Sequence, residues 1–287
     1  MKRKVLVLFV CILLLMAMSI TASADMGPKP SVQIDFTGTS GETYYATLLS
    51  KDNKYGPYSA WSGYISDAPS ERSDYDIWKK FVDYRDSDGF YFLQMWVDCT
   101  MTDAFTWDYY PPSTFKILLY FPERDAFYVS PIYERYAFSS YYTVDLSSPE
   151  GTSLQAETNY DYIGELISLV VRILLTIVIE MGIASWCGYR EKKLWKLLII
   201  VNAATQIILN VLLNIIAYYQ GALIFAIVYI LLELLVMIVE AIVYDILIPR
   251  FSDQYRSRGA AVCYAIVANL LSFAAGLLLA YVIPGLF

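Results

Sequence analysis

The chain has 287 residues, of which 57% are hydrophobic, and its mean hydropathy is +0.45. Soluble globular proteins are less apolar than this, so the composition indicates an integral membrane protein. The net charge of −7 argues against nucleic acid as a partner, and the absence of histidine excludes Ser-His-Asp triads, Cys-His dyads and histidine zinc sites.

The first residues have the features of a secretory signal. Lys2, Arg3 and Lys4 precede an apolar run, and the run ends in Ala22-Ser23-Ala24. This pattern predicts a signal peptide over residues 1–24 that is cleaved after its last alanine, with an uncleaved membrane anchor as the alternative. Either outcome exports the residues that follow.

Residues 25–160 have the composition of an exported, soluble domain. They contain 20 Asp and Glu against 10 Lys and Arg, which gives a net charge of about −10. Cys99 is the only cysteine among them, so no disulfide can form within this domain. Its stability must therefore come from a hydrophobic core.

Short β-branched and aromatic runs alternate with turn sequences through this domain, which is the pattern of β-strands. The predicted strands cover residues 31–36, 43–49, 90–97, 115–121, 126–130 and 141–146. Their number and spacing predict a β-sandwich of about seven strands. Residues 73–89 differ, because Tyr75, Trp78, Phe81, Val82 and Arg85 have helical spacing, so we predict one short helix there.

Two loops of this domain suggest binding. Asp86, Asp88 and Gly89 resemble part of a calcium loop, but the remaining ligand positions of an EF-hand are missing, so we predict an ordinary turn. Trp107, Tyr109 and Tyr110 lie beside two prolines, and we predict that they form a recognition loop. For the other tyrosines we favour packing in the core of the sandwich over a binding surface.

Residues 161–287 are dominated by apolar runs long enough to span a bilayer. We predict a bundle of four transmembrane helices near 163–187, 195–218, 221–247 and 259–284. The connections 188–196 and 248–258 are rich in Lys and Arg, which predicts that both are cytoplasmic. Residues 25–160 and the C-terminus are then outside a bacterial plasma membrane.

The segments ADMGPKPSVQIDF and GIASWCGYREKKLWKLLIIVNAATQIILN resemble a set of uncharacterised membrane proteins of Gram-positive bacteria. The resemblance covers nearly the whole chain. It implies an exported β-domain, a C-terminal helical membrane domain and a location in the cell envelope. No activity is attached to that set, so no role is transferred to any residue.

Polar residues recur inside the apolar segments. Asn202, Gln206, Asn210 and Asn214 follow each other at steps of four, so they lie along one side of a helix. Polar groups within lipid need polar partners, and the neighbouring segments have charged residues at similar depth. We predict one polar seam inside the bundle, formed by Arg172, Thr176, Glu180, Asn202, Gln206, Asn210, Asn214, Tyr229, Glu233 and Glu240.

Three hypotheses compete for this polar seam. We favour interhelical adhesion or a docking face for partner helices. An ion- or proton-coupled transporter that uses the three glutamates is the alternative, and an intramembrane enzyme is the least favoured. We predict no catalytic residue, no cofactor and no metal.

We expect an envelope protein that serves as a recognition, sensing or accessory subunit of a membrane complex. Its expected partners are the lipid bilayer and either another protein or further copies of this chain.

Overall fold

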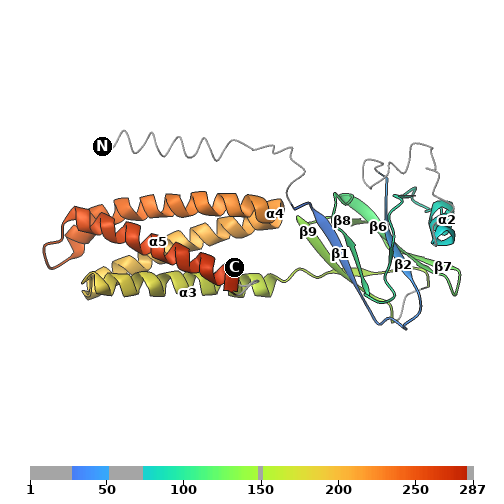
Figure 1. The fold of residues 1–287 in the computed structure, drawn as a ribbon, viewed down its shortest axis with the longest axis horizontal. Helices are drawn as coiled ribbons and strands as arrows, with labels where there is room; N and C mark the ends of the chain where they lie inside the picture. The colour runs from blue at the N-terminus through green and yellow to red at the C-terminus, as the bar shows by residue number, and fades with distance from the viewer. Residues whose placement is uncertain (1–27, 52–73, 148–150, 283–287) are drawn as a thin grey trace. The chain divides into compact units, whose positions relative to one another are not determined.

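The computed structural model describes residues 28–51, 74–147 and 151–282 (Figure 1). The chain combines a β-sheet region with long apolar helices, which confirms a mixed α and β composition. It divides into two compact units, one of residues 29–161 and another that contains the helices from Tyr162 onward. The predicted signal peptide lies outside the described residues.

The first sheet has four strands in the order β10-β9-β1-β5. Their bounds are Ser31–Thr37 for β1, Ala104–Trp107 for β5, Ser139–Asp145 for β9 and Ala156–Thr158 for β10. Strand β1 runs parallel to β9 and antiparallel to β5. Val32, Ile34 and Phe36 alternate along β1, and all three are buried because one face of this sheet covers the core.

The second sheet is built around β2 (Tyr45–Ser50) and β6 (Thr114–Phe121), which pair antiparallel. Its main order is β3-β2-β6-β7, with β4 also on β2 and β8 also on β6. The shorter strands are Tyr91–Phe92 for β3, Val97–Asp98 for β4, Ala126–Val129 for β7 and Tyr133–Glu134 for β8.

The prediction of one continuous strand over 90–97 is wrong. Gln94 has a φ of 59°, which a β-strand does not accommodate, and the run is split into β3 and β4. Both pieces pair antiparallel with β2, β3 beside Leu49 and β4 beside Ala46. They therefore act as one interrupted neighbour of β2.

Strand β6 is buried on both of its faces. Phe115, Ile117 and Leu119 enter a core to which β1 of the other sheet also contributes. Leu118 and Tyr120 point the other way and pack with Phe81 of helix α2 (Tyr75–Asp83). The predicted short helix is thus present, although it ends before Arg85 because Tyr84 is extended.

Three helices are long and apolar enough to cross a membrane, counted over the described residues. They are α3 (Tyr162–Trp186), α4 (Lys192–Phe251) and α5 (Arg258–Val282). Their outward surfaces remain apolar, as expected for lipid contact. Exposed side chains on them include Leu166, Leu174, Val178, Ile200, Ile208, Leu212, Ile230 and Leu270.

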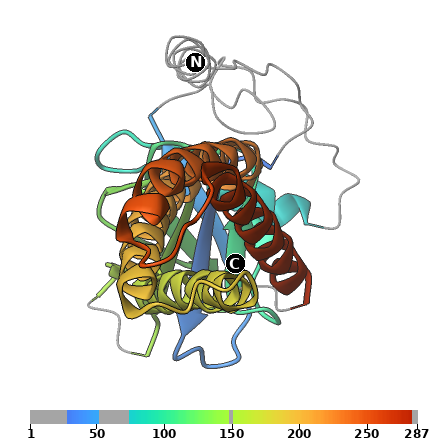
Figure 2. The ribbon, with the colours of Figure 1, turned by 90° about the vertical axis from the view of Figure 1, so that its left-hand side faces the viewer.

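Helix α4 folds back on itself. Its 60 residues would extend about 90 Å as one straight helix. The backbone is non-helical at Gly221, where a φ of 76° favours glycine. Leu209 and Leu213 before this break pack against Leu232 after it, so the two halves lie side by side. Figure 2 views the helices along their length and shows α3, both halves of α4 and α5 grouped together.

Candidate functional site

Most residues of the polar seam lie inside the helical unit. Arg172, Glu180, Asn202, Gln206, Asn210 and Glu240 are buried, whereas Thr176, Asn214, Tyr229 and Glu233 are half-buried. The opposite side of the first half of α4 exposes Ile200, Ile207 and Ile208. We call Asn202, Gln206, Asn210 and Asn214 the amide ladder. Its side of the helix faces inward, and the opposite side is apolar.

Glu240 is held by donors from two other segments. Thr205 Oγ1 donates to Glu240 Oε1 at 2.5 Å, and Asn269 Nδ2 donates to Oε2 at 2.8 Å. Thr205 belongs to the first half of α4 and Asn269 to α5. This carboxyl therefore joins three helical segments.

Glu180 of α3 is buried beside Glu240, and the two carboxyls interact electrostatically. Ser272 Oγ of α5 lies 3.5 Å from Glu180 Oε1, and the Asn202 side chain also interacts with the same carboxyl. Tyr264 OH donates to the backbone oxygen of Glu180 at 3.3 Å. We call Glu180, Asn202, Thr205, Glu240, Asn269 and Ser272 the carboxyl cluster.

The two buried amides of the carboxyl cluster also bond to their own helices. Asn202 Nδ2 donates to Leu198 O and to Tyr244 OH, each at 3.1 Å. Asn269 Nδ2 donates to Ala265 O at 3.0 Å in addition to Glu240. Because each nitrogen faces a backbone carbonyl, the orientation of each amide is determined.

A second polar group surrounds Arg172. Its Nη2 donates to Asn214 Oδ1 at 3.3 Å, and its Nε lies 3.4 Å from Ser168 O. Tyr229 interacts electrostatically with Arg172 and is in hydrogen-bonding contact with Glu233. The residues of the polar seam thus form more than one cluster.

The middle of the amide ladder bonds within itself. Asn210 Nδ2 donates to Gln206 Oε1 at 3.2 Å and to Gln206 O at 2.8 Å. We predicted that charged residues of the neighbouring helices meet these amides, whereas these two bonds lie within a single helix. Adjacent steps of one helix can satisfy each other because they lie on the same face.

Sequence analysis left Thr205, Asn269 and Ser272 out of the polar seam. Thr205 follows Asn202 by three residues and Ser272 follows Asn269 by three, so each pair shares a helix face. The three-residue spacing between an asparagine and a hydroxyl residue in an apolar segment is the signal that would have identified Thr205 and the pair Asn269 and Ser272.

The described part of the chain contains no group of three or more His, Cys, Asp or Glu side chains that could hold a metal ion. The polar side-chain atoms of the carboxyl cluster are all oxygens and amide nitrogens. The cluster can therefore exchange protons or hold a hard cation, and it offers no thiol nucleophile.

The predicted recognition loop is only partly accessible. Trp107 is 2% exposed within the core of the β-unit, and its Nε1 donates to Tyr109 O at 3.0 Å. Tyr109 and Tyr110 are exposed, with ring centroids 5.1 Å apart. Trp107 anchors the loop, and the two tyrosines are its exposed part.

A separate hollow of about 230 Å³ lies in the same unit. Arg124 contacts this hollow, but its guanidinium already pairs with Glu42 at 2.8 Å and lies 4.4 Å from the Phe121 ring centroid. The hollow is lined by Thr39, Ser40, Glu42, Tyr44, Phe121, Arg124, Tyr128, Leu146 and Ser147.

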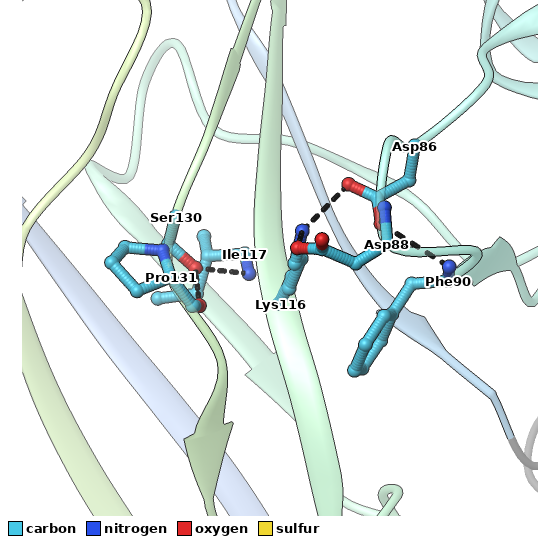
Figure 3. Close-up of polar contacts among 7 residues, drawn as sticks. All are labelled: Asp86, Asp88, Phe90, Lys116, Ile117, Ser130 and Pro131. Atoms are coloured by element: carbon cyan, nitrogen blue, oxygen red, sulfur yellow. Dashed lines mark hydrogen bonds and ion pairs between the residues drawn. The ribbon is translucent and has the colours of Figure 1, made fainter.

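The β-unit also contains a buried lysine, Lys116 (Figure 3). Lys116 Nζ of β6 lies 2.8 Å from Asp86 Oδ1 and 2.5 Å from Asp88 Oδ2. Asp86 Oδ2 accepts from the backbone nitrogens of Asp88 and Phe90, so this acidic segment is a turn, as predicted. Sequence analysis missed Lys116 as its partner.

Burial and bonding act in opposite directions on these charges. Desolvation by burial acts to raise the pKa of Asp86, but hydrogen bonds from Lys116 and from two backbone amides outweigh it and lower that pKa. Desolvation acts to lower the pKa of Lys116, and the two aspartates outweigh it and raise that pKa. Asp86 and Lys116 therefore remain charged as a structural ion pair.

Cys99 is fully buried, and burial raises the pKa of its thiol to about 12. Such a thiol is inert at neutral pH.

Comparisons with protein-family models, with curated proteins and with solved structures find no match for the chain.

Proposed function

We propose that this protein is a multi-pass protein of a bacterial plasma membrane that acts as a recognition, sensing or accessory subunit of a membrane complex. The main observation is the pairing of an acidic β-unit, which presents Tyr109 and Tyr110, with apolar helices whose polar residues are mostly buried. Exposed tyrosines suit recognition because they combine an apolar ring with a polar tip.

The proposal includes four transmembrane spans. A 60-residue α4 is about three times as long as the 30 Å hydrocarbon layer. The break at Gly221 and the contacts between the halves of α4 support two antiparallel spans. With α3 and α5, the bundle then has four.

The basic connections support the proposed sidedness. Lys193 Nζ lies 2.8 Å from Asp253 Oδ1, and Arg256 Nη2 donates to Gly188 O at 2.8 Å. Loops 188–196 and 248–258 therefore lie together, as two cytoplasmic loops would. Residues 25–160, which we propose form a β-sandwich, and the C-terminus are then outside. The shared core of the two sheets supports the sandwich.

The test is purification of the tagged full-length protein from membranes in a mild detergent, followed by mass spectrometry. We expect a stoichiometric partner with the wild type, and loss of that partner in the double variant Tyr109→Ser/Tyr110→Ser. Ile132→Ser is the matched control, because Ile132 is about as exposed in the same unit. Recovery of the protein alone, or a partner retained by the double variant, would contradict the proposal.

The second candidate is an ion- or proton-coupled transporter. The observation that favours it is the pair of buried carboxyls, Glu180 and Glu240, in direct electrostatic interaction. Ionisable groups at such positions commonly belong to ion pathways. Reconstituted Glu233→Gln and Glu240→Gln proteins should then lose a cation flux that Asn210→Leu retains. Wild-type flux in both glutamine variants would reject this candidate.

A further inference from the structure

Three oxygens of the carboxyl cluster have no hydrogen-bond partner among the described residues. They are Glu180 Oε2, Asn202 Oδ1 and Asn269 Oδ1. The relative exposure of these residues is 0%, 0% and 3%. Burial of a polar atom without a partner is costly, and native proteins rarely tolerate it. The three acceptor oxygens therefore require a hydrogen-bond donor or a cation as a partner.

Rotation of the amides does not remove this requirement. Exchanging oxygen and nitrogen in Asn202 would place its oxygen against Leu198 O, and the same exchange in Asn269 would oppose Ala265 O. Both arrangements bring two acceptors together. All three unsatisfied atoms are hydrogen-bond acceptors, which only a donor or a cation can satisfy.

Within the described part of the chain, no basic side chain forms an ion pair with the carboxyl cluster. Arg172 is the only basic residue in residues 163–187, 197–247 and 259–284. It lies eight residues before Glu180 on α3, about 12 Å along the helix, and bonds to Asn214 instead. The other ionisable groups that act on the two carboxyls are Glu233, Tyr244 and Tyr264. None of these groups supplies positive charge.

We propose that the carboxyl cluster is a binding site for one sodium ion, with which a proton competes. Carboxylate, amide and hydroxyl oxygens are hard ligands that suit such a cation. A proton on Glu180 can serve one acceptor only, whereas a metal ion can contact several oxygens at once. One sodium ion and one proton together neutralise Glu180 and Glu240.

This inference deepens the transporter candidate, and it is tested by binding and not by flux. Sodium chloride is titrated into the full-length protein in sodium-free detergent by calorimetry, and potassium chloride is the ionic-strength control. We expect saturable binding of one sodium ion per chain with release of a proton. The apparent dissociation constant should rise by up to about tenfold for each unit of pH decrease, because one proton competes.

Variants locate the site. Glu180→Gln retains the size of the side chain and should abolish sodium binding, while Ser272→Ala should weaken it several-fold. Asn210→Leu is the matched control, because it removes a buried amide of the same ladder whose bonds go to Gln206. This variant should bind sodium as the wild type does.

Two results would overturn the site. The first is the absence of any sodium-specific heat between pH 6 and 9, including the case in which only protons bind. The second is sodium binding that persists in Glu180→Gln. Binding without flux would reject transport alone and leave the sodium site standing.

Discussion

The two units of this protein bury acidic groups in opposite ways. In the β-unit, Asp86 is 1% exposed and Lys116 is 4% exposed, and the two side chains neutralise each other. In the helical unit, Glu180 and Glu240 are equally buried, but their neighbours are amides, hydroxyls and each other. The acidic group of the β-unit has its positive partner, whereas no described basic residue pairs with those of the helical unit.

This difference separates a structural site from a candidate functional one. A buried charge with a fixed partner contributes to stability as long as the partner is present. A buried carboxyl without such a partner must bind a proton or another cation, so its state depends on the surroundings. Substitutions at the two sites should therefore change the stability of the protein by different amounts. One substitution in the helical unit, Glu180→Gln, should not destabilise it.

The largest effect is expected from Lys116→Met. Removing this cation leaves Asp86 buried without its partner, which should lower the free energy of unfolding by about 3 kcal/mol. The measurement is denaturant unfolding of the full-length protein, followed by tryptophan fluorescence. Lys80→Met is the matched control, because the Lys80–Asp125 pair is solvent-exposed and its loss should change little. Equal stability of the two variants would contradict the structural role of Lys116.

A smaller effect is expected from Thr205→Val in the helical unit. The change preserves side-chain shape but removes the donor to Glu240 Oε1, and such a hydrogen bond contributes about 1 kcal/mol. Thermal unfolding in detergent measures the loss. Thr176→Val, on the half-buried part of α3, serves as the control. If both valine variants unfold at the same temperature, Glu240 does not depend on Thr205.

The contrast between the sites also separates what sequence could predict from what it could not. Binary patterns located β1 and α2, because each has a regular alternation with one buried face. The ladder was predicted to face inward, and Asn202, Gln206 and Asn210 do so. Each step turns by about 40°, so Asn214 is only half-buried, although it still accepts a hydrogen bond from Arg172 of α3.

Tertiary partners were beyond these patterns. In the run FKILLYF, Lys116 alternates with core residues and resembles an exposed position. Its burial results from the turn that contains Asp86 and Asp88, which is 28 residues or more away in sequence. Likewise, Asn269 meets Glu240 because of the rotation of α5, and a single sequence does not specify that rotation.

Acidification should lower the stability of the β-unit by less than the substitutions described above. The pKa of Asp86 is lowered in the folded protein. Its ionised form therefore stabilises the fold at any pH above the ordinary pKa of an aspartate. This contribution is lost as the pH falls through the lowered pKa. Wild-type melting temperatures should therefore fall on acidification more than those of Lys116→Met. Parallel curves for the two proteins would show that Asp86 is not stabilised by Lys116.

The smallest change, and the only one expected not to destabilise, is Glu180→Gln in sodium-free detergent. The glutamine amide adds a donor to a cluster in which three acceptor oxygens have no partner among the described residues. The substitution also removes one of two interacting carboxyls, so the melting temperature should stay the same or rise, by at most about 1 kcal/mol in stability. Glu240→Gln is the matched comparison and should destabilise, because both oxygens of Glu240 already accept hydrogen bonds and an amide nitrogen would face a donor. A destabilised Glu180→Gln would mean that the Glu180 carboxylate is already satisfied within the protein, which would remove the contrast with Asp86.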